Sequence, residues 1–171
     1  MADEAKVMLK LLGEGSLAPK HSTNWWWNVG DKHMVWFYAV TKFSQAPYPR
    51  TIQVEKTWVT TPEANKIVIK GGFKREVFLV FKEAVNNIAK HSDATRVEID
   101  LDVNIVEFNL NISDDGKGFD IDQMSETDGG NGLLSMRRRA EAVNGSVTII
   151  SAPGSGTRIA LALPLEQTIS P

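Results

Sequence analysis

The segment KEAVNNIAKHS, residues 82–92, combines the apolar period of a helix with polar groups that could do chemistry. Glu83 and Asn87 stand four residues apart, so they share one helix face. His91 repeats that step from Asn87, and Lys90 lies three residues beyond Asn87. Carboxylate and amide oxygens suit magnesium, which takes few protein ligands beside phosphate and water. A lysine can neutralise phosphate charge, although a solvated polar face has the same pattern.

A second segment, DDGKGFD at 114–120, follows a predicted strand. Gly116 and Gly118 would let the backbone turn tightly and approach a ligand closely. Asp114, at the strand end, could accept a hydrogen bond from a ligand amine. A plain loop is the alternative. A calcium loop of the EF-hand kind is excluded, because the alternating acidic positions and the final glutamate are missing.

A third segment, GGNGLLSM at 129–136, leads glycines into the start of a predicted helix. Free N–H groups and the helix dipole favour phosphate at such a start. A flexible glycine hinge is the alternative. It is not a Walker loop, because no G-K-[ST] follows, and it is not a dinucleotide fingerprint, because no strand immediately precedes it.

Apolar spacing predicts the elements that must position these segments. We expect helices at 32–44, 73–91 and 131–145, and strands at 51–59, 96–103, 105–112, 146–151 and 158–165. The buried face of the long helix should contain Val77, Phe81, Ala84, Val85 and Ile88. The hairpin strands should bury Val97, Ile99, Leu101 and Val103, and Val106, Phe108, Leu110 and Ile112. The last helix should bury Leu133, Met136, Ala140 and Val143, and Asn144-Gly145 should end it.

Composition narrows the class of protein. The chain has 171 residues, of which 42% are hydrophobic, enough for one domain with a real core. A formal net charge of −2 gives no electrostatic case for nucleic acid or an anionic membrane as a partner. The Trp cluster in NWWWN could stack bases, but it has no basic flank. The chain has no cysteine, which excludes disulfides and thiolate metal sites.

No targeting or spanning segment is visible in the sequence. The longest apolar run, MVWFYAV at 34–40, is too short for a bilayer, and the start MADEAK has no signal-peptide core. We therefore expect this part of the protein to be cytoplasmic, while a membrane anchor elsewhere in a longer parent protein stays open.

In their order and spacing, the three segments together resemble the ATP-binding catalytic domain of sensor histidine kinases, within the gyrase, chaperone, histidine kinase and MutL (GHKL) ATPases. FKEAVNNIAKHSDATRVEI is similar to the N box and its following strand, and DDGKGF resembles the first glycine box. NGLLSMRRRAEAVNGSVTIISAPGSGTRIALALP resembles the second glycine box through to the end of the domain. The N-box glutamate and M-R-x-R-A resemble the nitrate-sensor and desaturase-sensor subgroup. The match covers about residues 72–165, and 32–71 fits by pattern only.

The resemblance implies roles on the long helix. Asn87 would coordinate a magnesium ion that bridges the phosphates. Glu83 would stand where relatives place a metal-polarising or water-activating group, and it is a second metal candidate. Lys90 and His91 would face the phosphate chain. Glu83, Asn87 and Lys90 are the catalytic candidates.

It also implies an adenine pocket. Asp114 would accept from the adenine amine, Gly116 and Gly118 would let the ring approach, and Thr157 in G-S-G-T would support the pocket, partly through water. The 119–132 loop would be a small mobile lid. The remaining ATP-binding positions, at the lid hinge and the start of the next helix, would be Gly130, Gly132 and Leu133.

The implied fold is an α+β two-layer sandwich, with a mixed, mostly antiparallel sheet of about five strands against about three helices. The implied activity is that of a protein-histidine kinase with ATP and Mg²⁺ as cofactors. Its partners would be the dimerisation and phosphoacceptor helices and, indirectly, a response regulator. Neither His21 nor His33 has the acceptor pattern, so we expect the acceptor on another segment. We assign 1–30 to a connector or remnant, 31–166 to the ATP-binding domain and 167–171 to a tail.

Three other functions remain open at this point. A stand-alone serine kinase of the anti-sigma kind shares the fold and the boxes, although the M-R-R-R-A-E helix and the S-x-P-G-x-G-T ending favour the histidine kinase. A degenerate module that only mediates protein contacts is a second alternative, and the intact Asn87, Asp114 and glycines argue against it. Nucleic-acid binding through the Trp cluster is the third, with little support from charge.

Overall fold

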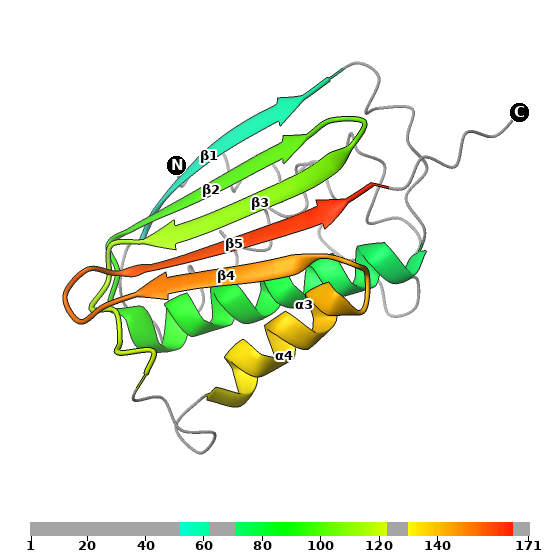
Figure 1. Cartoon of the computed structure of the whole chain (residues 1–171). Coiled ribbons are helices and arrows are strands. Elements are labelled where there is room, and N and C mark those ends of the chain that lie inside the picture. The colour runs from blue at the N-terminus through cyan, green and yellow to red at the C-terminus, as the bar shows by residue number, and fades with distance from the viewer. Residues whose placement is uncertain (1–51, 62–70, 123–129, 166–171) are drawn as a thin grey trace, which may run out of the picture.

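In the part of the chain that the structure describes, a five-stranded sheet forms one layer and two helices cover one of its faces (Figure 1). The computed structural model describes residues 52–61, 71–122 and 130–165. The elements are β1 (Gln53–Thr60), α3 (Gly71–Asn87), the π-turn η2 (Ile88–Ser92), β2 (Arg96–Val103), β3 (Glu107–Asp114), α4 (Gly130–Glu141), β4 (Ser146–Ser151) and β5 (Thr157–Pro164). The predicted α+β sandwich with five strands is confirmed. The expected helix at 32–44 and the segments 1–30 and 167–171 lie outside the described residues.

The sheet is mixed, with strand order β1-β2-β3-β5-β4. β1 runs parallel to β2, and the other neighbours are antiparallel. β2 is bounded as predicted, and alternate residues from Val97 to Val103 are buried. Such alternation leaves one face of the sheet for the helices and the other for water.

The start of β3 differs from the prediction. Val106 was expected on the buried face, but its side chain is 63% exposed, because β3 begins at Glu107, two residues after the predicted start at 105. The side-chain oxygen of Asn104 accepts hydrogen bonds from the N–H groups of Val106 (2.8 Å) and Glu107 (3.0 Å). This Asx-type turn lengthens the hairpin connection, so Val106 lies in the turn.

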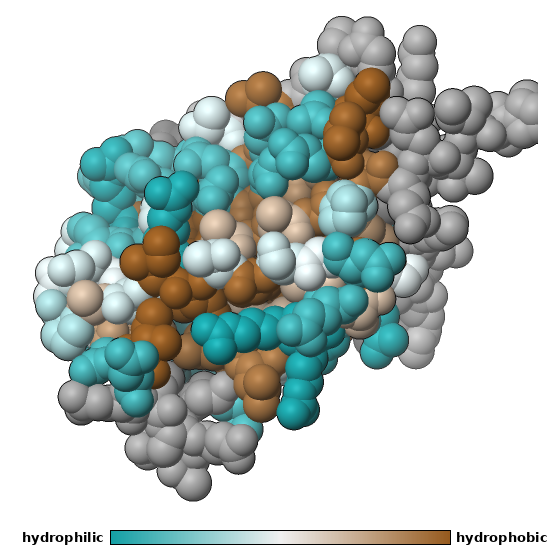
Figure 2. All heavy atoms as spheres, viewed as in Figure 1, coloured by the Kyte–Doolittle hydropathy of each residue, from teal (hydrophilic) through white to brown (hydrophobic). Residues whose placement is uncertain are grey.

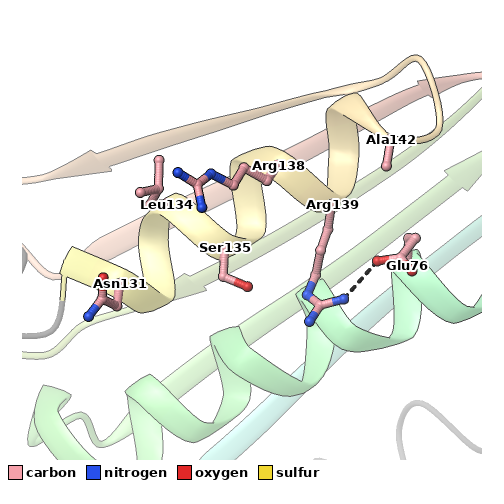
Figure 3. Close-up of a pocket in the computed structure, with 7 residues that line it drawn as sticks. All are labelled: Glu76, Asn131, Leu134, Ser135, Arg138, Arg139 and Ala142. Atoms are coloured by element: carbon pink, nitrogen blue, oxygen red, sulfur yellow. Dashed lines mark hydrogen bonds and ion pairs between the residues drawn. The ribbon is translucent and has the colours of Figure 1, made fainter.

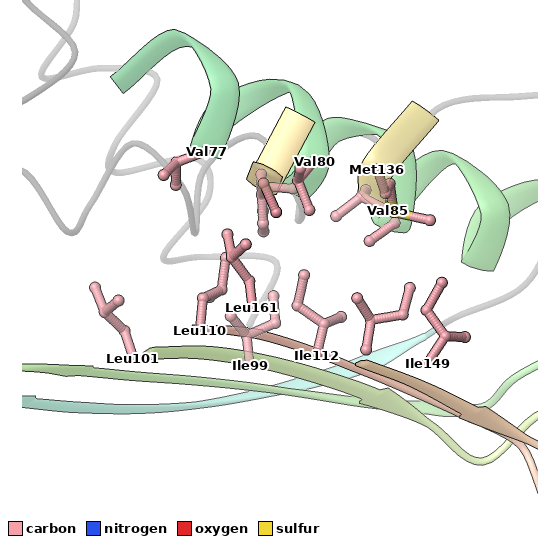
Figure 4. Close-up of a cluster of buried hydrophobic side chains, with 14 of the residues drawn as sticks. Val77, Val80, Val85, Ile99, Leu101, Leu110, Ile112, Met136, Ile149 and Leu161 are labelled. Carbon is pink, nitrogen blue, oxygen red and sulfur yellow. The ribbon is translucent and has the colours of Figure 1, made fainter. Parts of the chain in front are cut away.

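The hydrophobic core lies between the helices and the sheet (Figure 4). In Figure 4, side chains of α3 and α4 point down onto side chains that rise from the strands. Every residue predicted for the buried face of α3 is buried, and Val80 joins them. Full burial of one aliphatic or aromatic side chain contributes about 1.5–3 kcal/mol, so this layer contact is what holds the helices in place.

The C-terminal end of α3 is wider than an α-helix. The predicted helix ran to His91, but the α-helical part ends at Asn87 and a π-turn continues to Ser92. Ser92 Oγ donates to the carbonyl of Ile88 (2.8 Å) and accepts from the N–H of Ala94 (3.0 Å). Single π-turns of this kind are frequent at functional sites.

Helix α4 is bounded and fastened by identifiable contacts. It ends at Glu141, four residues before the predicted end at 145. Asn144 then adopts the left-handed region (φ 59°), and the N–H of Gly145 bonds the carbonyl of Ala140 (2.9 Å), so Asn144-Gly145 closes the turn that follows the helix. Arg139 Nη1 lies 2.8 Å from Glu76 Oε2, so a partly buried ion pair joins α4 to α3.

The outer surface in Figure 2 is mainly hydrophilic, and hydrophobic side chains gather where the edge of the sheet meets the helices. Among the described residues, the large hydrophobic side chains that remain exposed are Val59, Ile105, Val106 and Ile150. No helix within the described ranges has both the length and the apolar character that crossing a bilayer requires.

Met136→Ala tests how far α4 depends on the shared core. Met136 is completely buried between the layers, so removing its side chain should lower the free energy of unfolding by about 2–5 kcal/mol. Arg137→Ala, one residue later and exposed, is the matched control. Urea denaturation measures both. Equal midpoints for the two variants would contradict the packing described for α4.

Candidate functional site

A row of polar side chains interrupts the buried face of the sheet at one end. Asp114 lies opposite Val97 on one side and opposite Thr157 on the other, and Thr157 in turn lies opposite Ser151. Residues in register across neighbouring strands point to the same face. Asp114 and Thr157 share that face with Ile112 and Ile159, their apolar neighbours along β3 and β5. The end of the core layer is therefore polar, as a binding site needs.

Asp114 is the buried carboxylate of this row. It is only 9% exposed, and its Oδ1 accepts a hydrogen bond from the N–H of Gly116 (2.9 Å). Burial is the main cause that raises the pKa of Asp114 above the usual carboxyl range, and the nearby charge of Asp115 adds to it. Backbone hydrogen bonds from Gly116 and Thr157 act in the opposite direction. A buried acceptor of this kind suits a ligand that brings its own donor.

The adjacent carboxylate, Asp115, has a different function. Its oxygens accept from Thr95 N (2.8 Å), Thr95 Oγ1 (2.7 Å) and Arg96 N (2.8 Å). Partial burial raises the pKa of Asp115, but the hydrogen bonds from Arg96 and Thr95 outweigh it, and the net shift is downward. Asp115 thus fastens the loop after β3 to the start of β2, a role that sequence reasoning missed.

The two predicted glycines of this loop are both required by close contacts. A β-carbon on Gly116 would collide with the carbonyl oxygen of Ser92 and lie 2.7 Å from Asp114 Oδ1. Gly118 has φ 58°, and a β-carbon there would collide with the carbonyl oxygen of Ala152. The N–H of Lys117 also bonds the carbonyl of Ser92 (2.6 Å). The loop is therefore packed against the π-turn, which brings the first glycine box to the end of the N box.

The predicted residues of α3 lie toward its C-terminal end. Glu83 and Asn87 are partly buried one turn apart, and Lys90 and His91 are exposed on the π-turn. A β-carbon on Gly132 would lie 2.5 Å from Glu83 Oε1, so the carboxylate of Glu83 packs against the first turn of α4. This contact was not predicted from the sequence.

The start of α4 contains the second group of predicted ATP-binding positions. Gly130, predicted at the lid hinge, is the first residue of α4, one residue before the predicted helix start at 131, and residues 123–129 of the predicted lid lie outside the described residues. Leu133 is 8% exposed and belongs to the hydrophobic core, so it packs the first turn of α4 onto the core. The structure thus brings Asp114, Gly116, Gly118 and Thr157 together at the sheet end, and Glu83 together with Gly132.

An open groove of about 320 Å³ runs along the outside of the helix pair (Figure 3). Its lining residues are Glu76, Asn131, Leu134, Ser135, Arg138, Arg139 and Ala142. None of them belongs to the positions predicted from the sequence. In Figure 3 the Arg139–Glu76 ion pair crosses this groove and joins the two helices. The ion pair therefore positions α4.

The donor chemistry fits a magnesium–phosphate pair. Within 52–61, 71–122 and 130–165, no three acidic or imidazole side chains gather into a metal cage. Magnesium needs only one or two protein oxygens when phosphate supplies others. The Glu83 carboxylate lies beside the first turn of α4, a helix N-terminus of the kind that favours phosphate. Asn87, one turn further along α3, offers a second oxygen.

Comparison with known proteins gives a consistent result. Residues 72–167 match the family model of the histidine kinase-, DNA gyrase B- and HSP90-like ATPase. Sensor histidine kinase LiaS of Bacillus subtilis (strain 168) is 34% identical over 97 residues, which cover 57% of this chain and 26% of LiaS. Sensor protein VraS of Staphylococcus aureus (strain COL) is 34% identical over 105 residues, 61% of this chain and 30% of VraS. The matches span about a quarter to a third of these relatives.

Solved structures agree on the fold. The histidine kinase domain of the Erythrobacter litoralis EL346 blue-light activated kinase has a TM-score of 0.55 and 14% identity, over 78% of this chain and 60% of that one. Acinetobacter baumannii histidine kinase AdeS has a TM-score of 0.56 and 17% identity, over 79% and 63%. With more than half of its residues matched by the family model, the chain belongs to the histidine kinase-, DNA gyrase B- and HSP90-like ATPases.

Proposed function

We propose that this domain binds Mg-ATP and donates the γ-phosphoryl group to a histidine on a separate dimerisation domain, as the catalytic domain of a two-component sensor kinase. The observation that carries the proposal is the buried Asp114 carboxylate with Gly116 against it, at the end of the sheet. A response regulator would be the indirect partner. The N-box Glu83 and the M-R-R-R-A run support the nitrate-sensor and desaturase-sensor subgroup.

In this proposal the purine lies at the polar row and the phosphates extend toward α4. Asp114 accepts from the exocyclic amine, and Gly116 and Gly118 leave room for the ring. The first turn of α4 at Gly132 donates N–H groups to phosphate. Lys90 and His91, both exposed, are close enough in sequence to Asn87 to face the phosphate chain.

Asn87 and Glu83 would hold the magnesium ion, which neutralises phosphate charge when it is bound. Glu83 is kept in place by its packing against Gly132, so its carboxylate is preorganised beside the phosphates. Chemistry in such a site consists mostly of positioning and charge stabilisation. The domain alone should therefore bind nucleotide and hydrolyse it slowly or not at all.

Calorimetric titration tests the proposal. A non-hydrolysable ATP analogue, ADP and a GTP analogue are titrated into the chain with and without magnesium. We expect adenine-selective binding that magnesium strengthens most for the triphosphate. A folded chain that binds none of them at millimolar concentration would instead be a degenerate module.

Asp114→Asn should abolish measurable adenine nucleotide binding, with a loss of about 100-fold or more. The variant replaces an anionic acceptor by an amide that can turn a donor toward the ligand amine, and hydrogen bonds to charged groups are the strong ones. Calorimetry measures the loss. Unchanged affinity would remove the adenine role of Asp114.

The same variant should leave the fold as stable as before or more stable at neutral pH. A raised carboxyl pKa means that the ionised form of Asp114 opposes folding. The penalty is absent below the unfolded-state pKa of about 3.9 and appears as pH rises through the raised folded-state pKa. Thermal unfolding at pH 3.5 and pH 7.5 measures it. An advantage of Asp114→Asn that shrinks toward neutral pH would contradict the raised pKa.

Asn87→Ala should weaken magnesium-dependent binding selectively. We expect the affinity for the ATP analogue with magnesium to fall about 10-fold or more, while metal-free ADP changes less than about 3-fold, because only a metal ligand is lost. Lys82→Ala, exposed on the same helix, is the control. Equal losses with and without magnesium would contradict a metal role.

A further inference from the structure

Ser151, the last residue of β4, connects three parts of the sheet end. Its Oγ lies 3.0 Å from the N–H nitrogen of Phe119, 2.9 Å from the carbonyl oxygen of Gly156 and 3.1 Å from Thr157 Oγ1. Phe119 belongs to the glycine loop, Gly156 to the β4–β5 turn and Thr157 to the polar row. One partly buried hydroxyl thus holds the loop, the turn and the row together.

The donors and acceptors fix the direction of each hydrogen bond. A serine hydroxyl has one hydrogen and two lone pairs. The carbonyl of Gly156 can only accept, so it takes the hydrogen of Ser151, and the N–H of Phe119 can only donate, so it occupies one lone pair. The contact between Ser151 and Thr157 must then use the hydrogen of Thr157.

We propose that Ser151 is a positioning residue that turns the hydroxyl hydrogen of Thr157 away from the ligand, so that Thr157 presents only lone pairs to the base. This inference rests on the proposed function of the site. Thr157 lies directly opposite Asp114 in the strand register. Two neighbouring acceptors then face the base, a pair that favours a 6-aminopurine and opposes a 6-oxopurine.

Loss of the Ser151 hydroxyl would change this pair. Thr157 would lose its acceptor partner, and its hydroxyl could rotate to donate to a 6-oxo group. Asp114 would be unaffected in its bond from Gly116. The expected signature is therefore a change in base selectivity, which a purely structural role of Ser151 would not produce.

The test measures the dissociation constants of ADP and inosine diphosphate, which differ at the 6-position, for wild type, Ser151→Ala and Ser151→Thr. Wild type should prefer ADP. Ser151→Ala should reduce the ADP preference by roughly 3- to 10-fold, the scale of one neutral hydrogen bond, and Ser151→Thr should retain it because the hydroxyl is kept. Ser155→Ala, an exposed serine of the adjoining turn, is the matched control and should leave the ratio unchanged.

Thr157→Val provides an independent arm that does not rely on Ser151→Ala folding. It should reduce the ADP preference to the same level, and adding Ser151→Ala to it should change the ratio no further, because no hydroxyl remains to be oriented. An unchanged ratio in Ser151→Ala, or equal weakening of both nucleotides, would overturn the inference and leave the proposed function intact. Wild type that binds neither nucleotide would overturn both.

Discussion

The candidate site depends on keeping one carboxylate, Asp114, inside the end of the core layer. A buried carboxylate is costly unless hydrogen bonds or a partner compensate it. Here the compensation from the protein is a hydrogen bond from Gly116 and backbone contacts from Thr157, and burial still raises the pKa of Asp114. The Asp114 carboxylate is therefore only partly compensated by the protein, so a hydrogen bond from a ligand donor would stabilise it further. Much of the surrounding structure, from the Asp115 anchor to the π-turn at Ser92, holds the Gly116 loop in place.

The proposed phosphate end of the candidate site depends on how α4 is held against α3. Met136 packs the helix onto the shared core, and the Arg139–Glu76 pair fixes its distance from α3 (Figures 3 and 4). With that spacing, the Glu83 carboxylate meets the first turn of α4 at Gly132, where any side chain would displace it. The glycine therefore serves the protein's own packing as well as any phosphate. The proposed base end and the proposed phosphate end are linked by α3 and the π-turn η2 that follows it, because the Ser92 carbonyl of η2 bonds the glycine loop.

The sequence predicted most of the elements because their buried faces repeat without interruption. β2 matched residue for residue, since strict alternation is bounded by clear turns. The prediction from sequence failed where a side chain replaced a backbone hydrogen-bond partner. Asn104 lengthened the hairpin turn and moved Val106 out of β3, and the π-turn after Asn87 could not be distinguished from helix because the residue spacing is nearly the same. The glycine boxes were found as motifs. Ser151 and Asp115 were not, because their contacts arise only when strands distant in sequence are brought into register.

The ionisation of Asp114 itself is the measurement that most directly tests whether this carboxylate receives the base. Carboxyl carbon NMR of the labelled chain, with Asp114→Asn to assign the signal, gives its pKa with and without saturating ADP. We expect the pKa of Asp114 in the free chain to lie above the usual value of about 3.9 and to fall when ADP binds, because an amine donor favours the ionised carboxylate. An ordinary pKa, or a raised pKa that ADP leaves unchanged, would contradict the claim that this carboxylate receives the base.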